Sequence, residues 1–221
     1  MVYPSKLSRA SVVGAALALI REQGVTALGM RAVAARLSVR PASLYKHVVD
    51  FAGLQALLAE HAAGDLLAAM EAAIARAPRS ASVESPKMPM LFMANEYLRF
   101  AREQPALYAM LTSQAGPPNS NDGSPAAMGL PSTVRTIPRV ARTALWKRLL
   151  QVVGDLTGSA DDSDAALALW AYLHGFVALE RAGMFGTEGP KGGFARGVKA
   201  MAAGLRRPTS GAHPAVAEPA P

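Results

Sequence analysis

The chain has 221 residues, of which 51% are hydrophobic, and a formal net charge of +7. This length allows one or two domains, and the hydrophobic share is sufficient for a buried core. The sequence contains no cysteine, which excludes disulfide frameworks and thiolate metal sites. No apolar run approaches the roughly 20 residues that span a bilayer, and residues 1–9 lack the apolar segment of a signal peptide. We therefore expect a soluble, cytoplasmic protein that does not contact a membrane.

The positive charge gathers near the start of the chain. Residues 1–50 contain seven lysines and arginines against two acidic residues, a local excess of five positive charges. Such an asymmetry suggests a polyanionic partner. Charge alone would favour a merely solvated basic surface, so the interpretation depends on the motif that lies beside it.

Residues 29–48 have the pattern of two short helices joined by a tight turn. A stripe of apolar residues with helical spacing covers residues 30–37, and Ser38 and Val39 then break the pattern. Pro41 fixes φ and lacks an amide hydrogen, which suits the first turn of a second helix. Leu44 and Val48 give that second helix its inward face. A first helix over residues 8–23, ended by Gly24, would pack over this pair.

The outward face of the second helix carries basic and polar side chains. Such side chains can contact phosphates, and those at the start of the helix can reach base edges. The candidate DNA-binding residues are Arg31, Arg40, Ala42, Ser43, Tyr45, Lys46 and His47.

The segment MRAVAARLSVRPASLYKHV, preceded by REQG, resembles the DNA-binding domain of TetR/AcrR-family transcriptional regulators. The run Leu44-Tyr45-x-His47 is the strongest part of the match. Three positions depart from the family pattern. Gly29 stands where a capping Thr or Ser is common, Ser38 stands where the turn usually has Gly, and Phe51 replaces a Lys that often contacts phosphate.

The resemblance implies an all-α fold with two domains. Residues 1–50 would form a three-helix helix-turn-helix domain, and residues 51–207 a helical ligand-binding and dimerisation domain. Residues 208–221 contain four prolines and no apolar anchor, so we expect a disordered tail.

We expect the second domain to consist of several helices, each with its own start and end signals in the sequence. Asp50 is expected to cap a helix over residues 51–77, and Pro105 to open a short one after a helix over residues 90–104. Residues 113–131 are expected to form a mobile loop, followed by a helix over residues 132–156. Asp161 or Ser163 should cap the next helix, which Gly183 ends, and a last helix follows.

The residues Trp170, His174 and Gly175 also resemble the WHG subgroup of TetR-type ligand-binding domains. An effector would be small and apolar, because the available walls are largely apolar. The candidate effector-binding residues are Met93, Tyr97, Phe100, Trp146, Trp170 and His174, and the alternative for each is plain core.

Apolar helix surface that the core of one chain cannot cover predicts a homodimer. The helix over residues 165–181 is apolar on two sides, of which one domain core covers only one. Pairing it and the last helix with their copies gives a four-helix interface. The candidate interface residues are Leu173, Phe176, Phe194, Val198, Met201 and Leu205.

The four histidines are scattered, and no nucleophile motif or phosphate loop is present, so we expect no enzyme, no metal and no cofactor. His61 and Asp65 share a helix face, but two ligands do not make a metal site. The leading hypothesis is a ligand-responsive regulator, a repressor that binds a palindromic double-stranded DNA operator as a homodimer. The alternative is an all-helical interaction protein whose basic surface binds another acidic partner.

Overall fold

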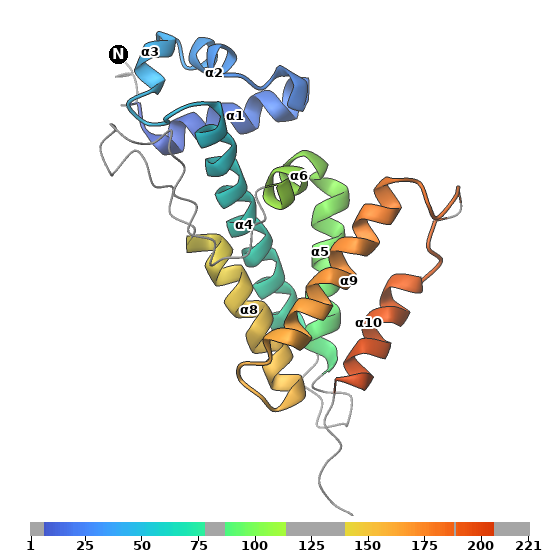
Figure 1. The fold of residues 1–221 in the computed structure, drawn as a ribbon. Coiled ribbons are helices and arrows are strands. Elements are labelled where there is room, and N and C mark those ends of the chain that lie inside the picture. Colours follow the sequence, from blue (N-terminus) through green and yellow to red (C-terminus); the bar gives the residue numbers. More distant parts are fainter. Residues whose placement is uncertain (1–6, 78–86, 114–139, 188, 206–221) are drawn as a thin grey trace, which may run out of the picture. The chain divides into compact units, whose positions relative to one another are not determined.

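The computed structural model describes residues 7–77, 87–113, 140–187 and 189–205, and within these ranges every regular element is a helix (Figure 1). The expected all-α fold is therefore confirmed. The chain forms two compact units, residues 1–77 with 92–149 and residues 78–91 with 150–221. The domain boundary that we expected at residue 50 stays a prediction.

The first unit starts with α1 (Arg9–Gln23), the 3-10 turn η1 (Val25–Ala27), α2 (Met30–Arg36), α3 (Pro41–Leu44) and α4 (Phe51–Arg76). The Ser8 hydroxyl accepts a hydrogen bond from the Ser11 amide at 3.1 Å, and the Ser11 hydroxyl accepts one from the Ser8 amide at 2.9 Å. This reciprocal cap fixes the start of α1. Gly24, with φ of 84°, ends α1 as expected. Asp50 caps α4 by accepting from the Gly53 amide at 2.7 Å, which confirms the predicted cap.

The remaining helices of the first unit include most of α5 (Lys87–Glu103), all of α6 (Pro105–Ser113) and the start of α8 (Val140–Thr157). Pro105 opens α6 as predicted, and α6 packs against α4. The helix expected from residue 90 begins earlier, at Lys87, because Pro89 fits within a first helical turn. The expected loop and the first part of the helix predicted from residue 132 lie outside the described residues.

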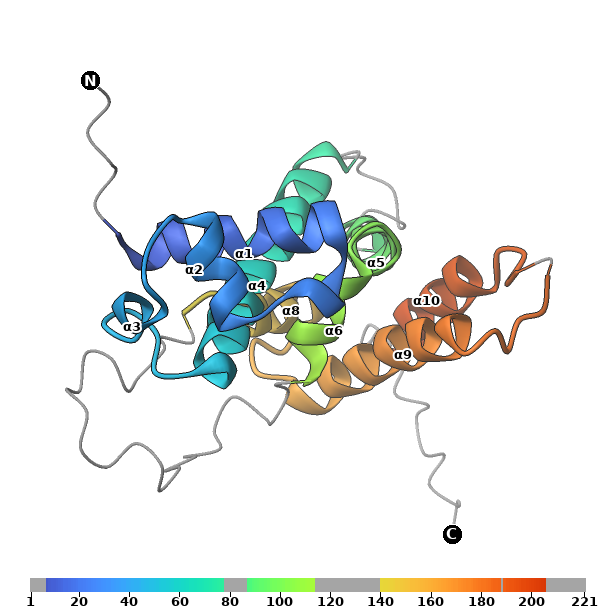
Figure 2. The ribbon, with the colours of Figure 1, turned by 90° about the horizontal axis from the view of Figure 1, so that it is seen from above.

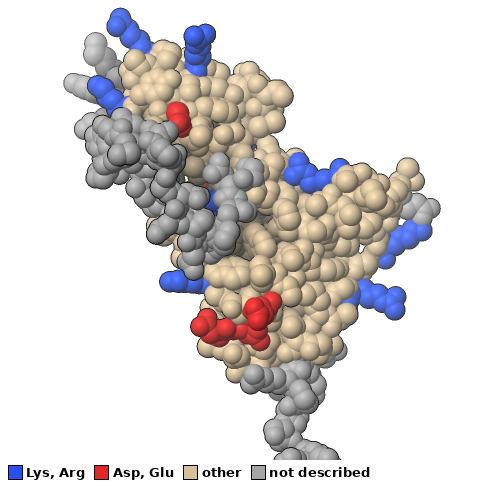
Figure 3. Space-filling view, in the orientation of Figure 1, with Lys and Arg blue, Asp and Glu red and all other residues tan. Residues whose placement is uncertain are grey.

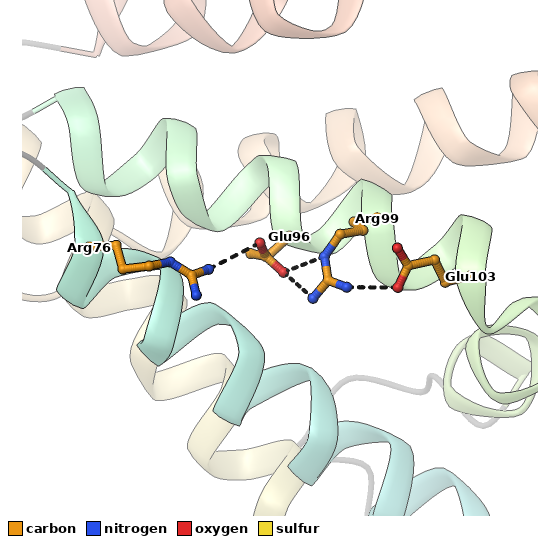
Figure 4. Close-up of polar contacts among 4 residues, drawn as sticks. All are labelled: Arg76, Glu96, Arg99 and Glu103. Atoms are coloured by element: carbon orange, nitrogen blue, oxygen red, sulfur yellow. Dashed lines mark hydrogen bonds and ion pairs between the residues drawn. The ribbon is translucent and has the colours of Figure 1, made fainter.

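Charged side chains connect α4 to its neighbours within this unit. Arg76 forms an ion pair with Glu96 of α5 at 3.6 Å, and Arg99 bridges Glu96 and Glu103 at 2.6 and 2.7 Å (Figure 4). On another side of α4, Glu71 pairs with Arg148 of α8 at 2.8 Å. The Glu60 carboxylate also accepts a hydrogen bond from the main-chain amide of Ala141, at the start of α8. Each of these pairs keeps at least one side chain accessible to solvent, which screens the attraction, so we expect them to orient α4 more than they stabilise the fold.

The second unit contains α9 (Ser163–Arg181) and α10 (Gly193–Gly204), which lie side by side in both views (Figures 1 and 2). The α9 cap is Asp162, whose carboxylate accepts from the Ala165 amide at 3.1 Å, so the prediction of Asp161 or Ser163 was wrong. The first helical residue is Ser163, and the residue directly before a helix is the one whose side chain can accept from the free amides of the first turn. Gly183, with φ of 70°, follows the end of α9 as predicted.

Aromatic rings fill the contact between α9 and α10. The Phe176 and Phe194 rings meet edge to face with centroids 4.9 Å apart, and the Tyr172 hydroxyl donates to the Phe194 carbonyl at 3.1 Å. Gly197 makes this contact possible, because a Cβ there would lie 2.0 Å from the Tyr172 hydroxyl oxygen. A side chain at position 197 would therefore have to displace the ring.

Candidate nucleic-acid interface

The turn between α2 and α3 has the conformation that the sequence pattern requires. Ser38 has φ of 55°, in the left-handed region where the family usually places glycine. Its cost of about 1–2 kcal/mol is offset by local hydrogen bonds. The Ser38 amide donates to the Ala35 carbonyl and the Val39 amide to the Ala34 carbonyl, each at 3.0 Å. The predicted helix-turn-helix is therefore present, with Gly29 as a cap that makes no side-chain bond.

The second helix of the motif is shorter than expected. We predicted a helix through Val48, but α3 ends at Leu44, and residues 45–47 form hydrogen-bonded turns. The amides of His47 and Val48 both donate to the Leu44 carbonyl, at 2.8 and 2.9 Å. In a continuous helix the His47 carbonyl would accept from the amide four residues on, in Phe51. Here Arg9 Nε donates to that carbonyl at 3.1 Å, and Asp50 starts a new helix instead.

Burial separates an inward face from an outward face in this segment. Leu44 and Val48 are buried, as predicted, together with Val33 and Ala34 of α2. Tyr45 is 48% exposed, and Lys46 is exposed as well. Of the seven candidate DNA-binding residues, Ser43 and His47 are half-buried and the others are exposed: Arg31, Arg40, Ala42, Tyr45 and Lys46. Figure 3 shows basic side chains projecting from the part of the first unit that carries α2 and α3.

Three of the candidate cations remain available to a ligand. Within the described residues, no hydrogen bond or ion pair engages the charged groups of Arg31, Arg40 or Lys46. Arg36, in contrast, forms a bidentate pair with Glu22 at 2.6 and 2.7 Å and joins α2 to α1. The guanidinium groups of Arg31 and Arg40 and the ammonium group of Lys46 can contact phosphate oxygens. Arg40 can in addition form hydrogen bonds with a base edge.

Sequence reasoning missed the supporting residues Arg9, Glu22 and Arg36. In the sequence, these residues contribute only to the net charge of residues 1–50. Glu22 and Arg36 are separated by 14 residues, and Arg9 and His47 by 38. No local spacing rule brings such positions together, so only the fold could reveal these contacts.

Comparison with known proteins identifies the chain. Residues 12–60 match the family model of bacterial regulatory proteins of the tetR family, and residues 90–201 match the tetracyclin repressor-like C-terminal domain. The chain belongs to the TetR family. Members of this family are transcriptional regulators and not enzymes, in agreement with our expectation. The second match includes Trp170, His174 and Gly175, on which the C-terminal resemblance was based.

Individual relatives agree with the TetR assignment. The uncharacterized HTH-type transcriptional regulator Rv0681 of Mycobacterium tuberculosis is 26% identical over 94% of this chain and 85% of its own length. A solved protein of unknown function from Rhodococcus sp. RHA1 has a TM-score of 0.68 and 23% identity, covering 94% of this chain and all of that one. A TetR variant from Acinetobacter baumannii AYE, solved in complex with minocycline, has a TM-score of 0.57 and 20% identity, covering 90% and 97%. The solved structures show that the TetR fold is shared.

The six candidate effector residues of this TetR protein belong to both units. Met93, Tyr97, Phe100 and Trp146 lie in the first unit, and Trp170 and His174 in the second. Met93 and Tyr97 are fully buried, Phe100 is buried, and the other three are half-buried. Their grouping around a ligand stays a prediction.

Tyr97 has a polar partner that the sequence did not suggest. Its hydroxyl lies 3.1 Å from the hydroxyl of Tyr108 in α6, and the two rings meet edge to face. Burial raises the pKa of Tyr97 well above its ordinary value, and Tyr108 raises it further. The pair supplies a polar group within an otherwise apolar region, which is the kind of group that orients a ligand in an apolar site.

The candidate dimer residues are largely covered within a single chain. Leu173, Phe176, Phe194 and Val198 are buried, while Met201 and Leu205 are half-buried. The Phe176–Phe194 contact explains part of this burial, because α9 and α10 cover each other. The large apolar side chains of α9 that stay exposed are Leu167 and Leu179, at 57% and 47% exposure. Dimerisation stays a prediction, and so do the residues that form its interface.

The described residues contain no cluster of side chains with the composition of a metal site. His61 Nε2 lies 3.4 Å from an Asp65 carboxylate oxygen, and no group of three or more potential metal ligands occurs in the described ranges. In those ranges, too, no helix has the length and apolar character needed to cross a membrane.

Proposed function

We propose that this TetR-family protein is a ligand-responsive repressor that binds a palindromic DNA operator as a homodimer. The observation that carries the proposal is the division of residues 40–48 into two faces. Leu44 and Val48 are buried against the domain, while Arg40, Tyr45 and Lys46 are exposed. The buried side chains fix this segment against the rest of the domain, and the exposed charged groups remain accessible to DNA.

We assign distinct roles to the exposed residues. Lys46 and His47, with Tyr45, would contact phosphates and set the position of the protein on the duplex. Arg40, Ala42 and Ser43 lie at the start of α3 and would face base edges. Arg31 at the start of α2 would add a phosphate contact. Phosphate contacts fix register, and base contacts supply sequence preference.

The effector would act through α4. Within the first unit, α4 contacts α1, which in turn contacts α2 of the helix-turn-helix, and α4 also packs against α6. Its ion pairs with Glu96 and Arg148 and the bond from Glu60 to the start of α8 join it to two further helices. A ligand that binds two orientations of α4 unequally would shift the motif between them. The candidate side chains favour a small apolar effector, and the minocycline-bound relative supports a small-molecule ligand in general.

The proposal is tested by selecting genomic DNA fragments that the purified protein retains. We expect enrichment of one palindromic sequence, and binding to it should exceed binding to a scrambled duplex at several salt concentrations. Retention without sequence preference would contradict the proposal and favour the alternative, an interaction protein for another acidic partner. The affinities for the enriched sequence and for a scrambled duplex are compared at each salt concentration. A sequence-specific regulator keeps a difference between these two affinities, because specific and non-specific binding share only the electrostatic contribution.

A further inference from the structure

The carboxylate of Glu60 in α4 bonds the main chain of α8. It accepts a hydrogen bond from the amide of Ala141, and its second oxygen lies 3.5 Å from the amide nitrogen of Arg142. Both amides belong to the first described turn of α8, which begins at Val140. Amides in the first turn of a helix need an acceptor from outside that helix, and a carboxylate that supplies it acts as a cap. The cap of α8 is therefore supplied by another helix.

The charge of Glu60 also suits this position. The first described turn of α8 contains no acidic residue, and it carries the cationic Arg142. Because the start of a helix has a partial positive charge, a carboxylate stabilises it and a cation does not. Glu60 and Arg142 are both half-buried, so solvent screens their surroundings less than it screens a fully exposed surface. Glu60 thus provides a negative charge that this turn lacks.

Gly64 allows α8 to come close to α4 beside this cap. It lies four residues after Glu60, on the same face of α4. A Cβ at Gly64 would lie 3.8 Å from the Cβ of Ala141, at ordinary van der Waals contact. Ala141 therefore packs on α4 where its amide bonds the Glu60 carboxylate. Hydrogen bonds of this type span only about 2.7–3.2 Å, so a shift of α4 by roughly 1 Å would break the cap.

Two polar contacts join α4 to α8, and the Glu60 cap is the one nearer to the helix-turn-helix. Along the axis of α4, Glu60 lies about 14 Å from Phe51 at the start of the helix. Glu71, which pairs with Arg148 of α8, lies about 30 Å from that start. A tilt of α4 about its far end moves Glu60 further than Glu71. The cap is therefore the contact that responds more strongly to the orientation of α4.

We propose that Glu60 is a positioning residue for DNA binding, whose carboxylate caps α8 in the orientation of α4 that presents the helix-turn-helix to DNA. The closed cap occurs in the same structure as the motif with exposed Arg40 and Lys46. This inference rests on the proposed function, and it adds a named main-chain contact through which α8 and DNA influence each other. Coupling of this kind is reciprocal, so a cap that favours DNA binding is itself strengthened when DNA binds.

The affinity test uses the full-length protein with the palindromic duplex enriched by the DNA selection and with a scrambled duplex. Glu60→Ala should weaken binding to the enriched duplex by roughly 2- to 30-fold, the range that corresponds to the loss of a helix cap. Binding to the scrambled duplex and its salt dependence should stay unchanged. Glu60→Gln, which keeps the length of the side chain and one acceptor oxygen, should lose less.

Glu71→Ala is the matched control for the lost negative charge. It removes the other carboxylate of α4 that contacts α8, but that carboxylate pairs with a side chain and does not cap the helix. Its pair is partly exposed, so its loss should change the affinity for either duplex by less than about threefold. An equal loss of affinity in Glu71→Ala and Glu60→Ala would show that the cap has no special part.

Hydrogen exchange measures the cap itself. In the wild-type protein, exchange in a fragment that covers the first turn of α8 should slow more with the enriched duplex than with the scrambled one. In Glu60→Ala this turn should exchange faster without DNA, and the enriched duplex should no longer slow it selectively. A cap that only stabilises α8 would give the same exchange with both duplexes. The measurement therefore separates coupling from a merely structural role.

The outcomes separate this inference from the proposed function. An unchanged affinity of Glu60→Ala for the enriched duplex would overturn the inference. A higher affinity would also overturn it, because the cap would then belong to an orientation of α4 that releases DNA. If Glu60→Ala fails to fold, Glu60→Gln and the exchange of the wild-type protein decide. Each of these results leaves the proposed function standing, whereas a selection that enriches no duplex contradicts both.

Discussion

Arg9 in the first helix donates from Nε to the main-chain carbonyl of His47 at 3.1 Å, across 38 residues of sequence. The contact engages a carbonyl in the turn after α3, at the end of the segment that carries Tyr45 and Lys46. Arg9 is half-buried, so its side chain is held between α1 and this segment. The orientation of the exposed residues is therefore set by α1 as well as by the motif itself.

Arg9 should act as a positioning residue for DNA recognition. Arg9→Lys keeps the charge but loses the geometry of the guanidinium, and Arg9→Gln loses both. Because a hydrogen bond from a charged group is worth about 1.5–3 kcal/mol, both variants should lose about tenfold or more in specific affinity. Non-specific affinity should fall little. The measurement is equilibrium binding to operator and scrambled duplexes across a salt series.

The two substitutions distinguish positioning from a direct phosphate contact. If Arg9 contacts phosphate, Arg9→Lys should keep its affinity, while Arg9→Gln should weaken operator and scrambled binding together and flatten the salt dependence. That pattern would contradict a positioning role.

Lys46 and Arg40 should affect different parts of the DNA affinity. Lys46→Ala is expected to weaken operator and scrambled binding equally and to reduce the salt dependence by about one counterion for each half-site. Arg40→Ala should instead relax preference at one base step, at a cost of roughly 1–3 kcal/mol. Lys199→Ala, an exposed lysine of α10, is the matched control and should leave the salt dependence unchanged. A Lys46→Ala protein with altered sequence preference and an unchanged salt slope would show that the assignment is wrong.

The sequence was sufficient for features that depend on neighbouring residues. The Asp50 cap, the Pro105 start, the stops at Gly24 and Gly183 and the left-handed Ser38 all follow from local backbone chemistry. The inward face of the motif followed from spacing, because buried residues recur with the helical period.

Features that depend on distant residues could not be predicted in this way. The contact between Arg9 and the His47 carbonyl is one of them, because it joins residues 38 positions apart in the sequence. The contact between Phe176 and Phe194 is another, because these two predicted interface residues pack α9 against α10 within one chain. Periodicity shows that a helix has two apolar faces, and it does not show which neighbour covers each face.

Ionisation of Tyr97 should make the protein sensitive to alkaline pH. Burial raises the pKa of Tyr97 in the folded state above the ordinary value of 10.0. Above about pH 10 the unfolded chain therefore releases this proton while the folded chain keeps it, so the free energy of unfolding falls as pH rises. Tyr97→Phe removes the ionisable group and should make this fall less steep. The measurement is urea denaturation between pH 8 and about pH 11, and equal slopes for both proteins would contradict the expectation.

Tyr97→Phe has a second effect, which does not depend on the ionisation of the side chain. At neutral pH Tyr97→Phe should also cost some stability, because it leaves the buried Tyr108 hydroxyl without the partner at 3.1 Å. The effect of pH is thus read from the slope, and the effect of the lost hydrogen bond from the value at pH 8.

We expect that position 197 needs glycine because the Tyr172 ring lies so close, and not because of the backbone conformation of α10. A Cβ at this position would lie 2.0 Å from the Tyr172 hydroxyl oxygen and 2.5 Å from the ring carbon that bears it. The ring is held in place, because its hydroxyl donates to the Phe194 carbonyl at 3.1 Å and the ring stacks with that of Phe194. Gly197→Ala should therefore destabilise the protein by about 1–3 kcal/mol in spite of the higher helix propensity of alanine. Urea denaturation measures the loss.

A double-mutant cycle separates the steric effect from other effects of the substitution. In a Tyr172→Ala background the obstructing ring is absent, so Gly197→Ala should cost nothing there or should stabilise the helix by up to about 1 kcal/mol. Gly204→Ala is the matched control in α10, because a Cβ there would meet nothing within 4 Å. If Gly197→Ala cost as much in the Tyr172→Ala background as in the wild type, the destabilisation would arise from the α10 backbone. The close approach of Tyr172 would then have no part in holding α9 and α10 together.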